Sequence, residues 1–279
     1  MKIRNPIMHP TAPQRLASPA KAGRNLATQL AKFAEYGNLV VLTLPNGGVL
    51  VGSVLAGILK APFDVMLVRE ITSPDRDDAV LGFLTGGGVR ILDYAMIDRL
   101  QVSDSELNAA ILRESMELAR LARFYRDGRP SVEIADRTVV LVDDGSTPCS
   151  KLRVAIRLAR RQHAERLIVA LPVTCHHVAC DLRLETATVV TLAEPPSAAV
   201  VGKWMRHFPK VTHHEVRRLV TAVLHDGDSN EPPALPSRPV AQPATWAPVS
   251  PGYPATHRFS FWWPPQARWT EPSNHEQLP

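Results

Sequence analysis

Two adjacent carboxylates, Asp143 and Asp144, directly follow four consecutive apolar residues, 139–142. A short continuous apolar run is typical of a strand that is buried on both faces of a sheet. Two acids at a strand end can accept hydrogen bonds from vicinal ribose hydroxyls, and can hold Mg²⁺ directly or through water. The pattern predicts a sugar site at this strand end, although acids before a helix are also an ordinary structural feature of α/β proteins.

The segment after the acids is rich in small and hydroxylated residues, and it leads into a basic amphipathic stretch, 151–161. Such a loop offers N–H and hydroxyl donors to a phosphate at the N-terminus of the following helix. The residues expected to supply these contacts are Gly145, Ser146, Thr147, Ser150 and Lys151.

Two further strand ends carry polar residues. Asn46-Gly47-Gly48 follows the apolar stretch 38–44, and its paired glycines allow backbone N–H groups to approach an anion closely. Val68-Arg69-Glu70 is expected to end a second strand, 63–68. Because ligands of α/β sheets bind beyond the carboxyl ends of the strands, all three ends are candidates for one site.

The elements that position these residues alternate between strands and helices. Ser103 and Glu106 form a capping-box pair at the start of a long predicted helix, and Gly86-Gly87-Gly88 marks the turn of a hairpin over 79–92. The alternation predicts an α/β fold with a mostly parallel twisted sheet, helices on both faces and a small hairpin insertion. The remaining strands are expected at 138–142, 167–173 and 188–192, and the helices at 22–36, 49–59, 103–125, 151–161, 178–184 and 212–224.

Composition divides the chain into three parts. Residues 1–20 are expected to be a flexible leader, and 21–225 a single domain. The tail, 226–279, holds 12 of the 25 prolines together with aromatic residues such as Trp246 and Trp262. Such a tail is either disordered or an extended segment that docks its aromatic side chains on the domain or on a partner.

Charge and cysteine content narrow the class of protein. The net charge of +5 is mild and is spread over several predicted helices, which favours a solvated basic surface over nucleic-acid binding and suits a small phosphorylated ligand. Three cysteines fit a reducing cytosol. No apolar run approaches the roughly 20 residues that span a bilayer, and prolines interrupt the first 13 residues, so a soluble cytoplasmic protein without a signal peptide is expected.

The cysteines suggest two further chemistries, both of which have simpler explanations. Cys149 precedes a predicted helix, where a thiol can be activated, but a small buried cysteine is the favoured interpretation. Cys175-His176-His177 with Cys180 contains metal-ligand types, but its spacing matches no common zinc pattern.

Residues from about 22 to 220 resemble the type I phosphoribosyltransferases, and most closely a bacterial subgroup that is sometimes fused to a hydrolase of the dienelactone type. The resemblance rests on motifs whose order and spacing cover most of the domain. These are LPNGG at 44–48, VRE at 68–70, GGGVRIL at 86–92, FYRDGRP at 124–130, RTVVLVDDG at 137–145, VALPV at 169–173 and VGKWMRHFP at 201–209.

The resemblance implies a function in nucleotide metabolism. Such enzymes bind phosphoribosyl diphosphate with Mg²⁺ and transfer the phosphoribosyl group to a nitrogen nucleophile. By this likeness, Asp143 and Asp144 hold the ribose hydroxyls and Mg²⁺, the loop 145–151 holds the 5′-phosphate, and Asn46-Gly47-Gly48 faces the diphosphate. A homodimer and a partner for the aromatic tail are further expectations.

Four positions depart from the family pattern, which usually has Ala-Thr-Gly-x-Thr after the acids. Pro148 has no N–H to donate there, and Cys149 replaces a glycine. Asn46 stands where the family has arginine, and Glu70 where it has lysine. At roughly 1.5–3 kcal/mol per charged hydrogen bond, losing two cations weakens diphosphate binding, so a catalytically inactive regulatory or binding protein is the alternative.

Overall fold

The computed structural model describes residues 18–34, 37–76, 78–145, 149–186, 188–197, 201 and 209–227. The leader predicted over 1–20 lies outside these residues apart from 18–20, and the tail predicted over 226–279 lies outside them apart from 226 and 227. No helix within the described ranges is both long and apolar enough to cross a membrane.

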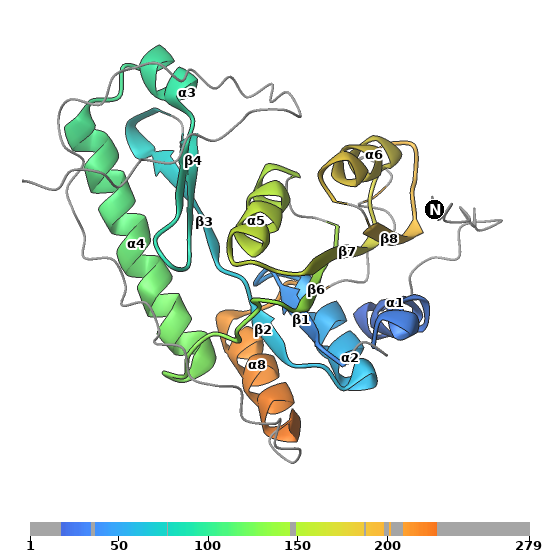
Figure 1. Cartoon of the computed structure of the whole chain (residues 1–279). Coiled ribbons are helices and arrows are strands. Elements are labelled where there is room, and N and C mark those ends of the chain that lie inside the picture. The colour runs from blue at the N-terminus through green and yellow to red at the C-terminus, as the bar shows by residue number, and fades with distance from the viewer. Residues whose placement is uncertain are drawn as a thin grey trace, which may run out of the picture.

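A five-stranded parallel sheet forms the centre of the fold (Figure 1), which confirms the predicted α/β class. In spatial order the strands are β2 (Phe63–Val65), β1 (Leu39–Thr43), β6 (Thr138–Val142), β7 (Arg166–Val173) and β8 (Thr188–Ala193). Helices cover both faces, because alternate residues of each central strand face opposite ways. They are α1 (Pro19–Ala34) and α2 (Gly48–Leu59) on one face, and α5 (Cys149–Arg161) and α6 (His176–Glu185) on the other.

Strand β6 shows why a continuous apolar run is needed at the centre of the sheet. Val140 and Val142 belong to the hydrophobic cluster that includes α1 and α2, whereas Val139 and Leu141 belong to the cluster that includes α5. All four side chains are fully buried. Burial of each aliphatic side chain contributes about 1.5–3 kcal/mol to stability. This burial holds β6 in the centre of the sheet and therefore fixes the position of Asp143 and Asp144 at its end.

The second sheet is antiparallel and contains the predicted hairpin, together with one strand that was not predicted there. It contains β3 (Val68–Ser73), β4 (Ala79–Thr85) and β5 (Arg90–Leu92). The single strand predicted over 63–68 was wrong, because the chain leaves one sheet and enters the other between Met66 and Leu67. The Met66 N–H still donates to the Thr43 carbonyl of β1 at 2.7 Å, whereas the Leu67 carbonyl accepts from the Gly86 N–H at 3.2 Å. Both segments are apolar, so the sequence carries no mark of the change.

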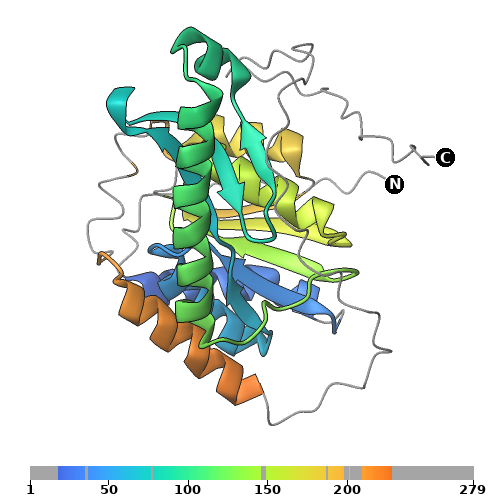
Figure 2. The same ribbon diagram turned by 90° about the vertical axis from the view of Figure 1, so that its left-hand side faces the viewer.

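A long helix, α4 (Asp104–Arg126), runs beside the antiparallel sheet (Figure 2). Helix α8 (His213–Gly227) lies across the C-terminal half of α4. The predicted capping box is confirmed, since the Ser103 side chain accepts from the Glu106 N–H and Glu106 accepts from the Ser103 N–H. The predicted turn at Gly86-Gly87-Gly88 is also confirmed. Two short elements were not predicted, namely the 3₁₀ helix η1 (Pro74–Arg76) and α3 (Tyr94–Arg99).

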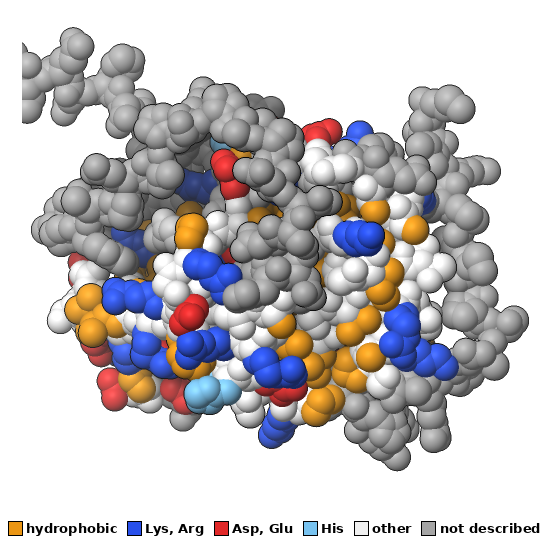
Figure 3. Space-filling view, turned by 90° about the horizontal axis from the view of Figure 1, so that it is seen from below, with side chains coloured by type: hydrophobic (Ala, Val, Ile, Leu, Met, Phe, Trp, Pro, Cys, Tyr) orange, Lys and Arg blue, Asp and Glu red, His pale blue; other side chains and the backbone are white. Residues whose placement is uncertain are grey.

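Basic side chains are spread over the surface of the described residues. On the face seen from below, lysine and arginine side chains alternate with hydrophobic and acidic ones rather than forming one continuous patch (Figure 3). This distribution agrees with the mild net charge.

A buried ion pair connects α4 to the parallel sheet. The Arg126 Nε lies 2.8 Å from Asp64 Oδ2, and its Nη2 donates to the Val65 carbonyl at 2.7 Å. Asp64 also accepts from the Val132 N–H at 3.0 Å. Only 2% of the Asp64 side chain and 11% of the Arg126 side chain are exposed. The pair therefore joins β2, α4 and the segment that leads to β6.

A second polar cluster holds α6 against the end of β8. Glu194 accepts from Thr191 Oγ1 at 2.7 Å, pairs with Arg183, and lies 3.1 Å from His176 Nδ1. Partial burial opposes ionisation of this carboxyl, but the hydrogen bonds from Arg183 and Thr191 outweigh it and lower its pKa to about 2.

Replacing Asp64 with alanine is expected to cost about 3 kcal/mol of unfolding free energy, because Arg126 is left buried without its counter-ion. Urea unfolding measures the loss. Glu117→Ala is the matched control on α4, the helix that carries Arg126. It removes an acid from the more exposed pair with Arg120 and should cost less than about 1 kcal/mol of unfolding free energy. Equal losses in the two variants would contradict this account of the ion pair.

The Glu194 cluster predicts a pH-dependent stability. Because the pKa is lowered in the folded state, the stabilisation is present above the ordinary value of 4.5 and is lost as the pH falls towards about 2. The native chain should therefore lose about 1 kcal/mol more than Glu194→Gln over that interval, a figure kept small because solvent screens the group. Urea unfolding at a series of pH values tests this, and parallel curves for the two chains would refute it.

Candidate functional site

The candidate site lies where the order of the parallel sheet reverses. From β1 the chain crosses through α2 to β2 on one side, whereas from β6 it crosses through α5 to β7 on the other. Because β1 and β6 are neighbours, with Thr43 opposite Val142 in the register, their carboxyl ends lie side by side between the two crossovers. Such a reversal point is the usual ligand position in an open α/β sheet.

The two acids at the end of β6 are buried. No part of Asp143 is exposed, and 5% of Asp144 is. The Asn46 Nδ2 donates to Asp143 Oδ1 at 2.8 Å, and the Gly145 N–H donates to Asp143 Oδ2 at 2.8 Å. Both oxygens of this carboxylate thus have a donor, which is what a buried carboxylate requires. The Asn46 contact joins the ends of β1 and β6.

Three glycines are required by the close approach of these segments. A Cβ on Gly47 would lie 2.0 Å from Asp144 Oδ2, and one on Gly48 would lie 2.9 Å from the Asp143 Cα. Gly145 has φ +92°, and a Cβ there would lie 1.9 Å from the Val173 carbonyl oxygen. The Gly48 N–H, at the start of α2, donates to Asn46 Oδ1 at 2.9 Å. The structure therefore brings the predicted residues Asn46, Gly47 and Gly48 against the acid pair.

The predicted phosphate loop is described only at its two ends. Ser146, Thr147 and Pro148 lie outside the described residues. Cys149 begins α5, and Ser150 lies in its first turn. The Lys151 Nζ lies 3.1 Å from Glu70 Oε1. This ion pair was not predicted from the sequence.

The expectation for Val68-Arg69-Glu70 was wrong in its placement. These residues begin β3 of the antiparallel sheet and do not end a strand of the parallel sheet. Arg69 turns towards α4, where its Nη2 lies 2.7 Å from Glu114 Oε2. Glu70 faces α5, where its carboxylate pairs with Lys151. Alternation along β3 separates the two, so Glu70 contacts α5 and Arg69 contacts α4.

Comparison with known proteins gives the family. No model of a protein family matches the chain. Two curated proteins from Mycobacterium tuberculosis strains CDC 1551 / Oshkosh and ATCC 25618 / H37Rv, each named "Putative phosphoribosyl transferase", are 31% identical over 195 residues. The alignment covers 70% of this chain and 44% of each relative, so the chain spans less than half their length. The chain belongs to the phosphoribosyltransferase family.

A solved structure agrees with this assignment at the level of the fold. The protein TT1426 from Thermus thermophilus is 31% identical and has a TM-score of 0.62, with 75% of this chain and 99% of that chain covered. The high coverage of the solved chain indicates that its elements recur in this phosphoribosyltransferase-family domain.

The described part of the chain was compared with the requirements of a metal site. Among the described residues, no group of three or more His, Cys, Asp or Glu side chains is arranged to hold a metal ion. In the Cys-His motif, Cys175 Sγ lies 3.6 Å from His177 Nε2, while His176 contacts Glu194. Asp143 and Asp144 remain the predicted Mg²⁺ ligands, in the mode where one or two carboxylates share the ion with ligand oxygens.

Cys149 is half-buried rather than fully buried as predicted. Burial raises the pKa of this thiol above its ordinary value, which outweighs the favourable charge of Arg153. A raised pKa leaves little thiolate at neutral pH. Cys149 therefore lacks the lowered pKa that marks a nucleophilic cysteine.

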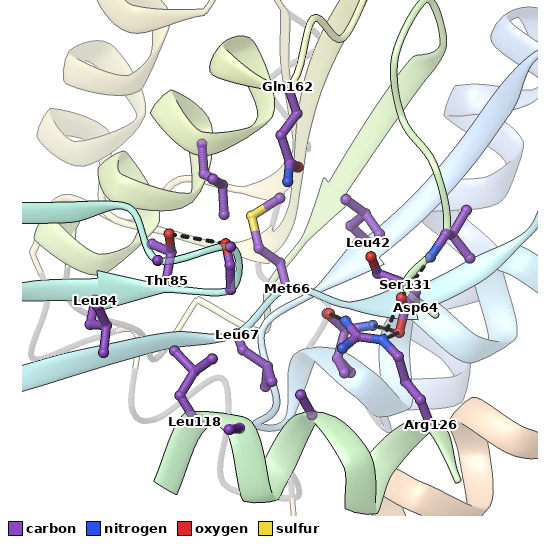
Figure 4. Close-up of a pocket in the computed structure, with 18 of the residues that line it drawn as sticks. Leu42, Asp64, Met66, Leu67, Leu84, Thr85, Leu118, Arg126, Ser131 and Gln162 are labelled. Carbon is purple, nitrogen blue, oxygen red and sulfur yellow. Dashed lines mark hydrogen bonds and ion pairs between the residues drawn. The ribbon is translucent and has the colours of Figure 1, made fainter. Parts of the chain in front are cut away.

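A separate cavity of about 650 Å³ lies between α4, the β4–β5 turn and the end of α5. Leu67, Leu84 and Leu118 form an apolar part of its wall, and Met66 and Gln162 extend towards each other across it (Figure 4). The Asp64–Arg126 pair lines one end. None of the predicted site residues that the structure describes lines this cavity, so it is distinct from the candidate site at the acid pair.

Adding a methyl group at Gly47 tests the contact with Asp144. Gly47→Ala should force the Asp144 carboxylate out of its position and cost about 2 kcal/mol of unfolding free energy, because the side chain is buried and enclosed. Urea unfolding and a crystal structure of the variant measure both effects.

Gly57→Ala is the matched control, since it lies in the adjoining helix α2 with no atom within 4 Å of the new Cβ. It should stabilise the chain by about 0.5–1 kcal/mol through helix propensity. An unmoved Asp144 in Gly47→Ala would show that the contact imposes no constraint.

Proposed function

We propose that this chain binds a ribose carrying a phosphate, with the sugar hydroxyls at Asp143 and Asp144. The observation that carries the proposal is the glycine-flanked acid pair at the sheet's reversal point, in a chain that belongs to the phosphoribosyltransferase family. The 5′-phosphate binds at the start of α5, where the helix dipole favours an anion and Lys151 supplies a cation.

The first candidate activity is transfer of the phosphoribosyl group from phosphoribosyl diphosphate to a nitrogen acceptor. The C1–oxygen bond breaks with its electron pair leaving on the diphosphate, and the nitrogen lone pair forms the new bond at C1. The chain contributes by positioning the sugar, since Asn46 and Gly145 hold Asp143 in one orientation. Asp143 and Asp144 are the residues that would hold Mg²⁺, and the ion would supply charge neutralisation for the diphosphate. A cytoplasmic role in nucleotide metabolism belongs to this proposal.

The second candidate is a binding or regulatory protein that keeps the fold and the ribose phosphate but does not turn over. A specific observation favours it. The amide of Asn46, at the position expected to face the diphosphate, donates to Asp143, and the one described lysine at the site pairs with Glu70. Neither arrangement supplies charge compensation for a leaving diphosphate.

Calorimetric titration distinguishes these candidates. Ribose 5-phosphate should bind the native chain, and Asp144→Asn should weaken binding at least about ten-fold through the loss of a charged hydrogen bond. Asp181→Asn, which removes an exposed acid from the pair between Arg153 of α5 and α6, is the control and should bind normally.

Release of diphosphate from phosphoribosyl diphosphate, with Mg²⁺ and a panel of nitrogen acceptors, would identify the transferase. Binding of ribose 5-phosphate without any such release would identify the second candidate. Failure to bind either ligand at millimolar concentration would refute the proposed function altogether.

A further inference from the structure

Helix α6 places a cysteine and a histidine in contact on its exposed face. Cys180 follows His176 by four residues, the spacing at which side chains on a helix are neighbours, and the Cys180 Sγ lies 3.5 Å from the His176 Nε2. Cys180 is also the exposed cysteine of the chain, since Cys175 is buried and Cys149 is half-buried. One thiol therefore combines a histidine contact with access from solvent.

A carboxylate sets the orientation of this histidine. The Nδ1 of His176, on the opposite side of the ring from Cys180, lies 3.1 Å from Glu194 Oε2. Partial burial opposes ionisation of Glu194, but hydrogen bonds from Arg183 and Thr191 lower its pKa to about 2, so it is charged at neutral pH. A charged carboxylate can only accept, which places a proton on Nδ1 and leaves Nε2 as an acceptor for the thiol proton of Cys180.

The cluster is tied to the end of β8 and contains a second cationic group. The His176 N–H donates to the Pro195 carbonyl at 3.0 Å, which fixes the start of α6 beside Glu194. Arg183 pairs with Glu194, and its guanidinium also hydrogen-bonds the side chain of Cys180. Reactive cysteines in proteins lie in partly exposed surroundings beside histidine, lysine or arginine, and Cys180 has such surroundings.

The position of Cys180 within a helix limits what its thiol can do. Acyl transfer by a thiol needs backbone N–H donors directed at a developing oxyanion. Cys180 lies inside α6 (His176–Glu185), where the neighbouring main-chain N–H groups are used by the hydrogen bonds of the helix. Thiol–disulfide exchange needs no such donors, because it requires only an accessible thiolate and a group that takes the thiol proton. The geometry therefore favours exchange with a disulfide over acyl transfer.

We propose that Cys180 is a modification site that exchanges with small disulfides, with His176 as the proton acceptor and Glu194 as the residue that positions His176. The thiol proton passes to the His176 Nε2, and the sulfur of Cys180 attacks one sulfur of the disulfide. A new sulfur–sulfur bond forms, the old one breaks, and its electron pair leaves on the departing sulfur, which takes the proton from His176. The products are a mixed disulfide on Cys180 and one free small thiol.

This modification uses none of the residues that the proposed function assigns to ribose phosphate binding. The inference is therefore independent of that function, and neither depends on the outcome of the other's test.

The test measures how fast each cysteine of the native chain forms a mixed disulfide with glutathione disulfide at neutral pH. Samples stopped with acid are analysed by mass spectrometry of the intact chain and of its peptides. Cys180 should be modified first, at least about ten-fold faster than Cys149. Cys180 should also react at least about ten-fold faster in the folded chain than in urea, because unfolding separates it from the residues that activate it.

Three variants assign the effect to the cluster. His176→Gln should slow the modification of Cys180 about ten-fold, and Glu194→Gln about three-fold, because the second change leaves the imidazole in place but removes its orienting partner. His177→Gln is the matched control, since His177 is the adjacent histidine and its Nε2 lies 3.6 Å from the Sγ of the buried Cys175. It should leave the rate at Cys180 within about two-fold of the native value. In urea all four chains should react at the same rate.

Several results would overturn the proposal. Equal rates at Cys180 in the folded and urea-unfolded native chain would do so without any variant, as would earlier modification of Cys149. An equal loss in His176→Gln and His177→Gln would show that the contact with Cys180 is not the cause. A native rate in Glu194→Gln would remove the positioning role of that carboxylate.

Discussion

The arrangement at the sheet's reversal point depends on the burial of the Asp143 carboxylate. An ionised carboxylate removed from water costs several kcal/mol unless its oxygens receive hydrogen bonds. Here the donors come from two separate segments, Asn46 beyond β1 and Gly145 beyond β6. The close approach of those segments leaves no room for a Cβ at Gly47, Gly48 or Gly145. The glycines that look like an anion-binding motif in the sequence are thus also required by the packing around one buried acid.

Much of the fold follows from patterns within short stretches of sequence. The apolar run before Asp143 predicts a strand buried on both faces, and Ser103 with Glu106 predicts the start of α4; both are present. The change of sheet after Met66 has no such local signal, because the hydrogen-bond partners of residues 66 and 67 lie on different strands while both side chains are apolar. The local sequence indicates which side chains are buried, whereas the choice of partner strand depends on the topology of the whole fold.

In the candidate site, too, some features are predicted by short stretches of sequence and others are not. The sequence predicts that Asn46, Gly47, Gly48, Asp143 and Asp144 meet at the carboxyl ends of the strands, and the structure brings them together. The sequence does not predict that Asn46 contacts Asp143, 97 positions away, or that Lys151 pairs with Glu70. These contacts depend on side-chain direction across two sheets. Alternation along β3 decides which of Arg69 and Glu70 faces α5, and that alternation can be counted only once the start of the strand is known.

The contacts that determine the fold are stronger than the charged contacts at the start of α5. The fold depends on alternating buried side chains in β6 and on glycine contacts such as that of Gly145 with Val173, where a substitution forces backbone to move. The charges of Glu70 and Lys151 lie in a partly exposed wall, where a pair contributes about 0–1 kcal/mol to stability. A change of charge at position 70 therefore costs the fold little. The sheet and the glycine contacts that position the acid pair do not depend on it.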